Sequence, residues 1–247
     1  MSDVVGNARA TALQMMSESG FQIGKDVSVV VDPQLPFMGY TVPLVSGGFR
    51  IVVSGGAVGT EMFSGLLIHE MSHIYRIENE HPSHDGELLE EAINNVSKSL
   101  RYEYQQKIIQ DLLNDIQDLY ADDIAFQVLR KNPTIPWDQL TSFLQSWVKD
   151  SQVKTNDRRR DRWVNSSTML HNARAIAQMR RHHVDDVGEV ATNSNKEFLA
   201  QLPPDMAREF DFFRDRLENL KENITRAEYR RLLSEYLNKF LSIAEKN

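Results

Sequence analysis

Residues 87–132 contain neither proline nor glycine, the two residues that most often end a helix. Apolar residues recur through this stretch at helical spacing, from Leu88 to Ile116. The pattern predicts one very long helix or two helices in series, with a break near Asn94 and Asn95. A chain with so much continuous helix must place any sheet elsewhere.

Segments with strand character occur only in the first quarter of the chain. They are residues 27–31, which are mostly valine, residues 37–45 and residues 49–53. Helical spacing is found on either side of them, at residues 3–18 and 60–76. The sequence therefore predicts an α+β fold that is mostly helical, with a small sheet near the N-terminus and a helical remainder.

The helix at residues 60–76 carries the sequence His69-Glu70-Met71-Ser72-His73. Residues four apart lie on one face of a helix, so both imidazoles can reach one metal ion while Glu70 lies beside it. Two neutral imidazoles and a third protein ligand leave zinc one position for water, whose pKa the metal lowers to about 7. Glu70 can accept the proton of that water and later donate one to a leaving amine. The motif therefore predicts a hydrolytic zinc site.

The strand at residues 49–53 leads through Gly55 and Gly56 into the helix that carries this motif. A free strand edge can hydrogen-bond an extended peptide. We therefore expect the edge of this strand to lie beside the metal and to hold a peptide substrate.

Two aspartates four residues apart, Asp118 and Asp122, occur late in the long helical stretch, where small alanines leave room for another helix. A carboxylate is a natural third ligand for zinc in a site with two histidines. A second carboxylate one turn further can hold a ligating imidazole by its outer N–H. The sequence thus predicts that His69, His73 and Asp118 bind Zn²⁺ and that Asp122 supports one of the imidazoles.

Residues 69–73 and 118–122 together resemble the gluzincin metallopeptidases. The resemblance is to the H-E-x-x-H plus E-x-x-A-D pattern of the membrane-associated family that includes the CAAX prenyl protease and its bacterial heat-shock relatives. It covers residues 49–130. It implies a zincin fold, a zinc ion held by the two histidines and a carboxylate from a later helix, Glu70 as general base, and hydrolysis of peptide bonds.

Two features differ from that family. The third-ligand position holds Asp118 in place of glutamate, so the carboxylate is one methylene shorter and its helix must lie closer to the metal. No stretch approaches about 18 consecutive apolar residues, so the membrane helices of that family are missing. We therefore interpret the chain as a soluble gluzincin-like relative and not as a prenyl-protein protease.

Other residues could supply the third ligand. Glu90 and Glu91 lie near the spacing at which aminopeptidase-type gluzincins place their glutamate. His81 and His84 follow the motif as a histidine does in metzincin-like sites, although the metzincin glycine and spacing are missing. The sequence leaves these alternatives open beside Asp118.

A tetrahedral intermediate needs a hydrogen-bond donor besides the metal to stabilise its negative charge. The chemically able residues are Tyr120, Tyr102, His171, His182 and Arg76. The resemblance favours His171, because related enzymes draw this residue from a helix beyond the one that carries the third ligand. We therefore expect Glu70 and His171 to be the catalytic residues.

Pro133 and Pro136 lead us to expect a zincin-like core at residues 1–132 and a helical region at residues 133–247 packed on it. Predicted helices lie at residues 137–147, at residues 163–183, after Pro203, and after a capping box at Thr225 and Glu228. We interpret the basic residues 158–160 as a solvated turn and residues 187–196 as a polar loop.

The amino-acid composition limits which kinds of partner and metal ligand the chain can have. The formal net charge is −7, with 35 acidic against 28 basic residues, which argues against a nucleic-acid-binding protein. Cysteine is absent, so any metal must be held by histidine, aspartate or glutamate. No secretory signal is recognised. We expect a cytoplasmic protein without membrane-spanning segments that acts on a peptide or protein substrate, and the sequence leaves its oligomeric state open.

A second class of function stays open. The chain could be a catalytically inactive zincin-like protein that binds or regulates a partner and keeps zinc for stability. Structural zinc sites are usually closed by four protein ligands, and His81 or His84 could provide the fourth.

Overall fold

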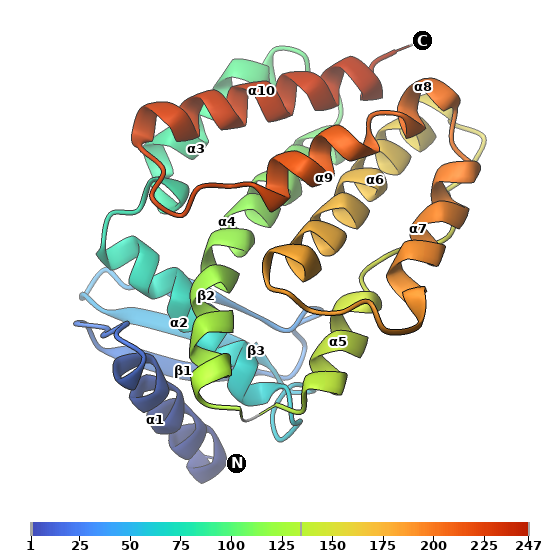
Figure 1. The fold of residues 1–247 in the computed structure, drawn as a ribbon. Coiled ribbons are helices and arrows are strands. Elements are labelled where there is room, and N and C mark those ends of the chain that lie inside the picture. The colour runs from blue at the N-terminus through green and yellow to red at the C-terminus, as the bar shows by residue number, and fades with distance from the viewer. Residues whose placement is uncertain (1, 134, 247) are drawn as a thin grey trace. The chain divides into compact units, whose positions relative to one another are not determined.

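A computed structural model describes residues 2–133 and 135–246. The chain divides into two compact units, each made of two stretches of sequence: residues 1–84 with 120–140, and residues 85–119 with 141–247. Helix α4 (Glu103–Lys131) contributes to both (Figure 1). The expected boundary at residue 132 does not coincide with this division, because the prolines that follow end a helix that both units share.

The first unit holds the small sheet and the helix with the histidine motif (Figure 1). Its elements in chain order are α1 (Ser2–Glu18), β1 (Val27–Asp32), β2 (Gly39–Pro43), β3 (Phe49–Ser54), α2 (Phe63–Glu78) and the short η1 (Pro82–His84), followed by the carboxyl-terminal part of α4. The strand order is β1-β3-β2, with β1 parallel and β2 antiparallel to β3. A mixed three-stranded sheet in a mostly helical chain confirms the coarse α+β prediction.

The central strand of this sheet is β3, and its position corrects one expectation. Strand β3 pairs with β1 from Val27 to Asp32 and with β2 from Gly39 to Pro43, so neither of its edges is free. It therefore cannot hold an extended peptide by its edge. In the part of the chain that the structure describes, the free edge on the side of α2 belongs to β2.

Helix α2 is held by its apolar face. Leu67, Ile68, Met71 and Ile74 are fully buried, and the helix packs against α1, β2 and β3. At Gly65 an added Cβ would lie 2.4 Å from Ile135 Cδ1, so the helix approaches the segment after α4 closely. This apolar burial fixes the face on which the motif histidines lie.

The second unit is all helical. Its elements are α3 (Gly86–Ser97), the first part of α4, the end of α5 (Trp137–Gln145), α6 (Arg158–Arg181), η2 (Val187–Glu189), α7 (Val190–Ala200), α8 (Pro204–Ala207), α9 (Phe210–Glu218) and α10 (Arg226–Ala244). Within it α6 packs against α7, α9 and α10, and α10 also packs against α3 (Figure 1). Trp163 of α6 is fully buried. Its ring packs edge to face on the ring of Phe240, with the ring centroids 5.3 Å apart.

The long helical stretch consists of two helices in series, and the break lies after Ser97, a few residues beyond Asn94 and Asn95. The buried Gln105 explains where the second helix begins. Its side-chain oxygen accepts hydrogen bonds from the backbone N–H groups of Arg101 at 2.7 Å and Tyr102 at 3.1 Å. These are donors that the start of a helix otherwise leaves without a partner.

Two local predictions were wrong. Residues 158–160 are the first turn of α6 and not a turn outside a helix, because the Asp157 carboxylate accepts from the backbone N–H of Arg160 at 2.9 Å and caps the helix there. The expected polar loop at residues 187–196 contains most of the first two turns of α7, because the Asp186 carboxylate accepts from the backbone N–H groups of Ala191 and Thr192. The predicted capping box of α10 is present.

None of the helices in residues 2–133 and 135–246 combines the length and the apolar character that crossing a membrane requires.

Candidate metal centre

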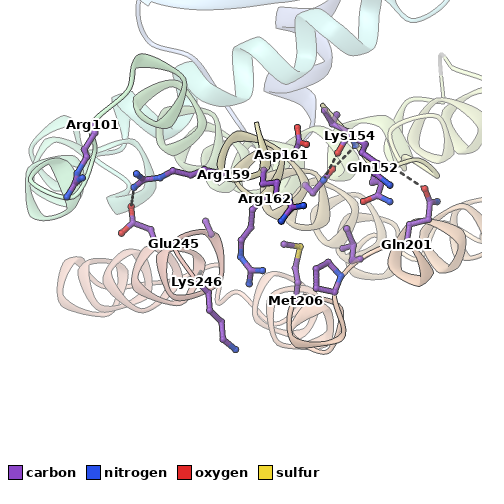
Figure 2. A pocket seen from close by; sticks show the side chains of 16 residues that line it. Arg101, Gln152, Lys154, Arg159, Asp161, Arg162, Gln201, Met206, Glu245 and Lys246 are labelled. Atoms are coloured by element: carbon purple, nitrogen blue, oxygen red, sulfur yellow. Dashed lines mark hydrogen bonds and ion pairs between the residues drawn. The ribbon is translucent and has the colours of Figure 1, made fainter. Parts of the chain in front are cut away.

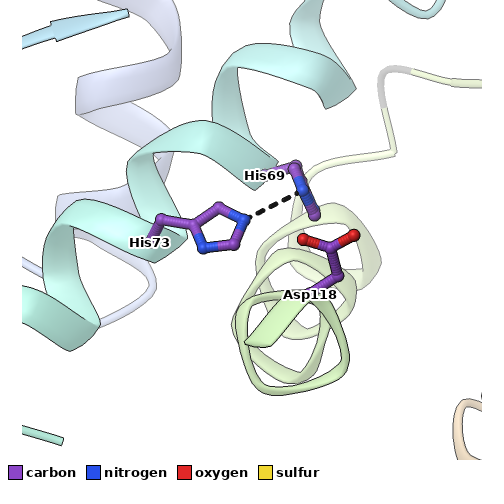
Figure 3. Close-up of side chains that lie close together, drawn as sticks. All are labelled: His69, His73 and Asp118. Carbon is purple, nitrogen blue, oxygen red and sulfur yellow. Dashed lines mark hydrogen bonds between the residues drawn. The ribbon is translucent and has the colours of Figure 1, made fainter. Parts of the chain in front are cut away.

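His69 and His73 lie one turn apart on α2, and Asp118 lies on α4 (Figure 3). One possible ligand atom from each of the three residues lies within 4.8 Å of the others. Among the described residues this is the group of acidic and histidine side chains that could hold a metal ion. These are the three residues that the sequence predicts as zinc ligands, and their binding of a metal stays a prediction.

Asp122 holds the outer side of His69. Its Oδ1 lies 2.6 Å from Nδ1 of His69, and the aspartate is buried. The carboxylate favours a proton on Nδ1, and in the neutral imidazole the lone pair is then on Nε2. The structure thus places the Asp122 carboxylate where the sequence predicted a supporting group, and its role toward a metal stays a prediction.

A chain of hydrogen bonds leads from His73 away from this centre. Nδ1 of His73 lies 2.7 Å from Nε2 of His84, Nδ1 of His84 lies 2.8 Å from Oγ of Ser83, and this oxygen lies 2.7 Å from Nδ1 of His81. The backbone N–H of Ser83 also donates to Nδ1 of His81 at 3.2 Å. A backbone N–H can only donate, so this nitrogen of His81 is an acceptor.

When each imidazole is neutral, the backbone N–H of Ser83 determines which atom donates in every hydrogen bond of this series. The hydroxyl of Ser83 must donate to His81 and accept from His84, which puts the proton of His84 on Nδ1. Nε2 of His84 is then an acceptor, and His73 must donate to it from Nδ1. The lone pair of His73 is therefore on Nε2.

The inner nitrogens of the two imidazoles lie close together. Nε2 of His69 and Nε2 of His73 are 3.1 Å apart (Figure 3). Two imidazole ligands at about 2.0–2.1 Å in tetrahedral zinc geometry have nitrogens about 3.3 Å apart. The separation of these two nitrogens is therefore close to the one that two zinc ligands need, so the donor set fits zinc.

Asp118 is placed by the same continuous helix as Asp122, one turn earlier, so both carboxylates lie on one face of α4. In the second unit, Oδ2 of Asp118 accepts a hydrogen bond from Nη2 of Arg174 at 3.2 Å. Carboxylates that bind metals are commonly held in this way by an outer partner. The bond orients the carboxylate through one oxygen.

Glu70, the predicted general base, is buried and is held by strand β2. Its Oε2 accepts a hydrogen bond from the hydroxyl of Thr41 at 2.7 Å. Its Oε1 would lie 3.5 Å from a Cβ added at Gly39, so glycine lets β2 approach this carboxylate. The side chain next to His69 therefore has a fixed orientation.

His171 lies on α6 and pairs with Asp115 on α4. Nδ1 of His171 is 2.9 Å from Oδ2 of Asp115, and Arg174 donates to Oδ1 of the same carboxylate at 3.2 Å. Burial lowers the pKa of His171. The hydrogen bond to Asp115 and the negative charge of Asp115 together raise this pKa by more than burial lowers it, so it lies above its ordinary value. Asp115 thus favours the protonated form of His171, whose catalytic role stays a prediction.

The other oxyanion candidates occupy different environments. Arg76 is buried and donates from Nε to the backbone carbonyl of Tyr120 at 3.1 Å. Tyr102 is exposed and lies under the guanidinium of Arg159. His182 is buried at the end of α6. Arg76 and Tyr102 thus already have partners of their own.

The alternative candidates for the third zinc ligand lie outside the group around His69 and His73. Glu91 forms an ion pair with Arg230 at 2.8 Å, and Glu90 is exposed on α3. His84 faces the ring nitrogen of His73 that points away from His69. His81 accepts hydrogen bonds on its Nδ1. Neither Glu90, Glu91 nor these histidines belongs to the group around His69 and His73 described above.

Sequence reasoning missed three residues of this region: Thr41, Arg174, and His84 as a partner of His73. Arg174 had a visible signal, because it is a charged residue four positions after Leu170 and three before Ala177 in an otherwise apolar stripe. Thr41 had none, because only the packing of β2 against α2 brings it to Glu70.

The sequence matches a family of unknown function, DUF5781, over residues 13–242. The match covers most of the chain, so this protein belongs to that family. No curated protein and no solved structure matches the chain.

Proposed function

We propose that this protein is a zinc-dependent metallopeptidase of the gluzincin type. The observation that carries the proposal is the group of His69, His73 and Asp118, in which one possible ligand atom of each residue lies within 4.8 Å of the others. His69 and His73 lie on the helix that also carries a buried glutamate, Glu70. The proposal includes a zincin-like arrangement of the sheet and α2 in the first unit.

In this proposal His69, His73 and Asp118 hold the metal, and Asp122 and His84 orient the two imidazoles. Zinc bound there would polarise a substrate carbonyl and lower the pKa of a water molecule. Glu70 accepts a proton from the water and passes one to the leaving amine. The hydrogen bond from Thr41 keeps the Glu70 carboxylate in one orientation during both transfers.

The free edge of β2 is the natural place for a substrate backbone, because this strand also holds Glu70. An extended peptide could add to it by main-chain hydrogen bonds. His171 is assigned to the stabilisation of the oxyanion, and its raised pKa favours the protonated form that donates a hydrogen bond.

The inactive alternative with a structural zinc finds less support. A structural site needs a fourth protein ligand, and the nearest further histidine, His84, binds the outer nitrogen of His73 instead. Its imidazole supports a ligand and does not close the site.

The test compares Glu70→Gln with Glu90→Gln, which removes an exposed carboxylate and leaves the metal group unchanged. Each protein is assayed for bound zinc and for cleavage of denatured casein. The cleavage that counts is the part that the zinc chelator o-phenanthroline inhibits. We expect zinc in all three proteins and cleavage by Glu70→Gln that is about 10²–10⁴-fold slower than wild type. Glu90→Gln should cleave like wild type.

Chelator-sensitive cleavage at the wild-type rate in Glu70→Gln would refute the mechanism. Zinc binding without cleavage of casein or of a peptide library by the wild type would favour the structural-zinc alternative. Absence of zinc from the wild type, even after incubation with excess metal, would refute both.

A further inference from the structure

A cavity of about 1010 Å³ lies in the second unit at the beginning of α6 (Figure 2). Its basic lining residues are Arg101, Lys154, Arg158, Arg159, Arg162 and Lys246. Its acidic lining residues are Asp161 and Glu245. In a chain whose formal net charge is −7, this concentration of positive charge requires an explanation.

Part of that charge is neutralised within the protein. Arg159 pairs with Glu245 at 3.7 Å (Figure 2). Arg162 and Lys246 share the Asp205 carboxylate at 3.0 and 3.1 Å, and their hydrogen bonds hold the pKa of Asp205 below its ordinary value. Two cations on one carboxylate still leave an excess of positive charge.

The remaining cations are not neutralised. Within residues 2–133 and 135–246, no ion-pair partner is found for the side chains of Arg101, Lys154 and Arg158, and all three are exposed. Asp161 forms no ion pair with them among the described residues, since its carboxylate accepts from the backbone N–H and the hydroxyl of Thr155, both at 2.7 Å, and its single charge offsets three cations only in part. The cavity therefore presents unpaired positive charge from residue 101 and from residues 154–158.

The start of α6 adds to this field. The backbone dipoles give the amino end of a helix a partial positive charge, which acidic side chains usually offset. Asp157 caps this end of α6, and the five residues that follow are Arg158, Arg159, Arg160, Asp161 and Arg162. The four arginines in these first turns are repelled by the helix dipole, and a bound anion would reduce that repulsion.

The wall of the cavity is held in place before any ligand arrives. The buried Asn165 accepts from the backbone N–H of Val153 at 2.7 Å and donates to its carbonyl at 2.8 Å. Gln201 donates to the carbonyl of Asp150 at 2.6 Å. These bonds pin residues 150–153 and reduce the conformational entropy that binding would cost.

We infer that this cavity binds a phosphorylated small molecule of nucleotide size with at least two phosphate groups. The three unpaired cations carry more positive charge than one phosphate group can neutralise, and arginine suits phosphate because its planar fork binds two oxygens. Buried Leu202 and Met206 give the cavity an apolar side for a less polar body. The concave shape favours a small molecule over a long polymer.

The test measures binding of ADP and of inorganic tripolyphosphate by isothermal titration calorimetry. The full-length protein is first treated with EDTA, so that a metal at the centre on α2 cannot bind the phosphates. The double variant Lys154→Ala with Arg158→Ala is compared with the control Lys196→Ala with Arg231→Ala. The control removes two exposed cations outside the cavity, so the change in net charge is the same.

We expect at least one of the two probes to bind to the wild type and to the control. The same probe should bind to the cavity variant at least about tenfold more weakly. Binding of ADP alone would show that the cavity also reads the nucleoside, and equal binding of tripolyphosphate would show that the phosphate chain suffices. Absence of binding at millimolar concentration would overturn the inference. So would equal weakening in both variants, or tighter binding of a single-stranded oligonucleotide than of either probe.

Discussion

The two histidines of the motif in the first unit and the basic cavity of the second use polar side chains in opposite ways. The outer ring nitrogens of His69 and His73 are each held by a neighbouring side chain, at 2.6 and 2.7 Å. In the cavity, Arg101, Lys154 and Arg158 have no ion-pair partner among the described residues. One region is connected internally, and the other leaves charge for something outside the chain.

The difference has a physical reason. A metal site needs ligand atoms in one geometry and one protonation state, which neighbouring hydrogen bonds supply. A site for a charged small molecule needs an electrostatic field and some freedom of its side chains. The first kind should lose function when an outer partner is removed, whereas the second should lose it only when the cations themselves are removed.

The largest effect is expected when Asp122 is removed from the metal centre. Asp122→Ala leaves the Nδ1 proton of His69 without its acceptor, so zinc affinity should fall by about 10–100-fold. The affinity is measured by competition with a fluorescent zinc chelator. Asp111→Ala, which removes a half-buried aspartate that pairs with Lys107 on the same helix, is the control, and urea unfolding checks that both variants fold.

Zinc affinity that is unchanged in Asp122→Ala would show that the bond to His69 does not support a metal ligand. An equal loss in Asp111→Ala would attribute the effect to general destabilisation of α4 and would remove the contrast between the two regions.

A smaller effect is expected at the other end of the centre. His84→Ala removes the acceptor for the Nδ1 proton of His73, and water can replace it in part, so zinc affinity should fall by up to about tenfold. His81→Ala, two links further along the chain of hydrogen bonds, should have less effect. The same competition assay measures both variants.

The order of these effects distinguishes two roles of His84. A loss in His84→Ala that exceeds the loss in Asp122→Ala would indicate that His84 binds the metal directly. Equal affinity in His84→Ala and the wild type would refute the chain of supporting hydrogen bonds.

The smallest effect concerns His171, which lies in the second unit but is paired as tightly as the histidines of the metal centre. Asp115 raises its pKa above the ordinary value of about 6.5. The protonated form is favoured in the folded protein, so the pairing stabilises the fold below about pH 6.5 and this contribution is lost as pH rises through the folded pKa.

The pKa of His171 can be followed by NMR titration of its ring nitrogens in wild type and in Asp115→Asn. We expect a value above 6.5 in the wild type and a lower one in the variant. A wild-type value at or below about 6.5 would show that burial outweighs the carboxylate.

Much of the local structure could be predicted because it depends on neighbours in sequence. The helix with the motif, the strands of the sheet and the capping box at Thr225 follow from periodicity and from side chains that bond their own backbone. The predictions failed where a single side chain made an unexpected cap. Asp157 starts α6 earlier than expected, and Asp186 turns a polar segment into α7.

The sequence by itself narrowed the residues that could form a metal site, because the spacing of His69 and His73 and of Asp118 and Asp122 puts each pair on one helix face. It could not determine how these faces meet. Only the tertiary structure puts Asp122 on Nδ1 of His69, Thr41 on Glu70 and His84 on His73. The physical reason is that these contacts join residues from different elements, and the packing of apolar faces decides which elements touch.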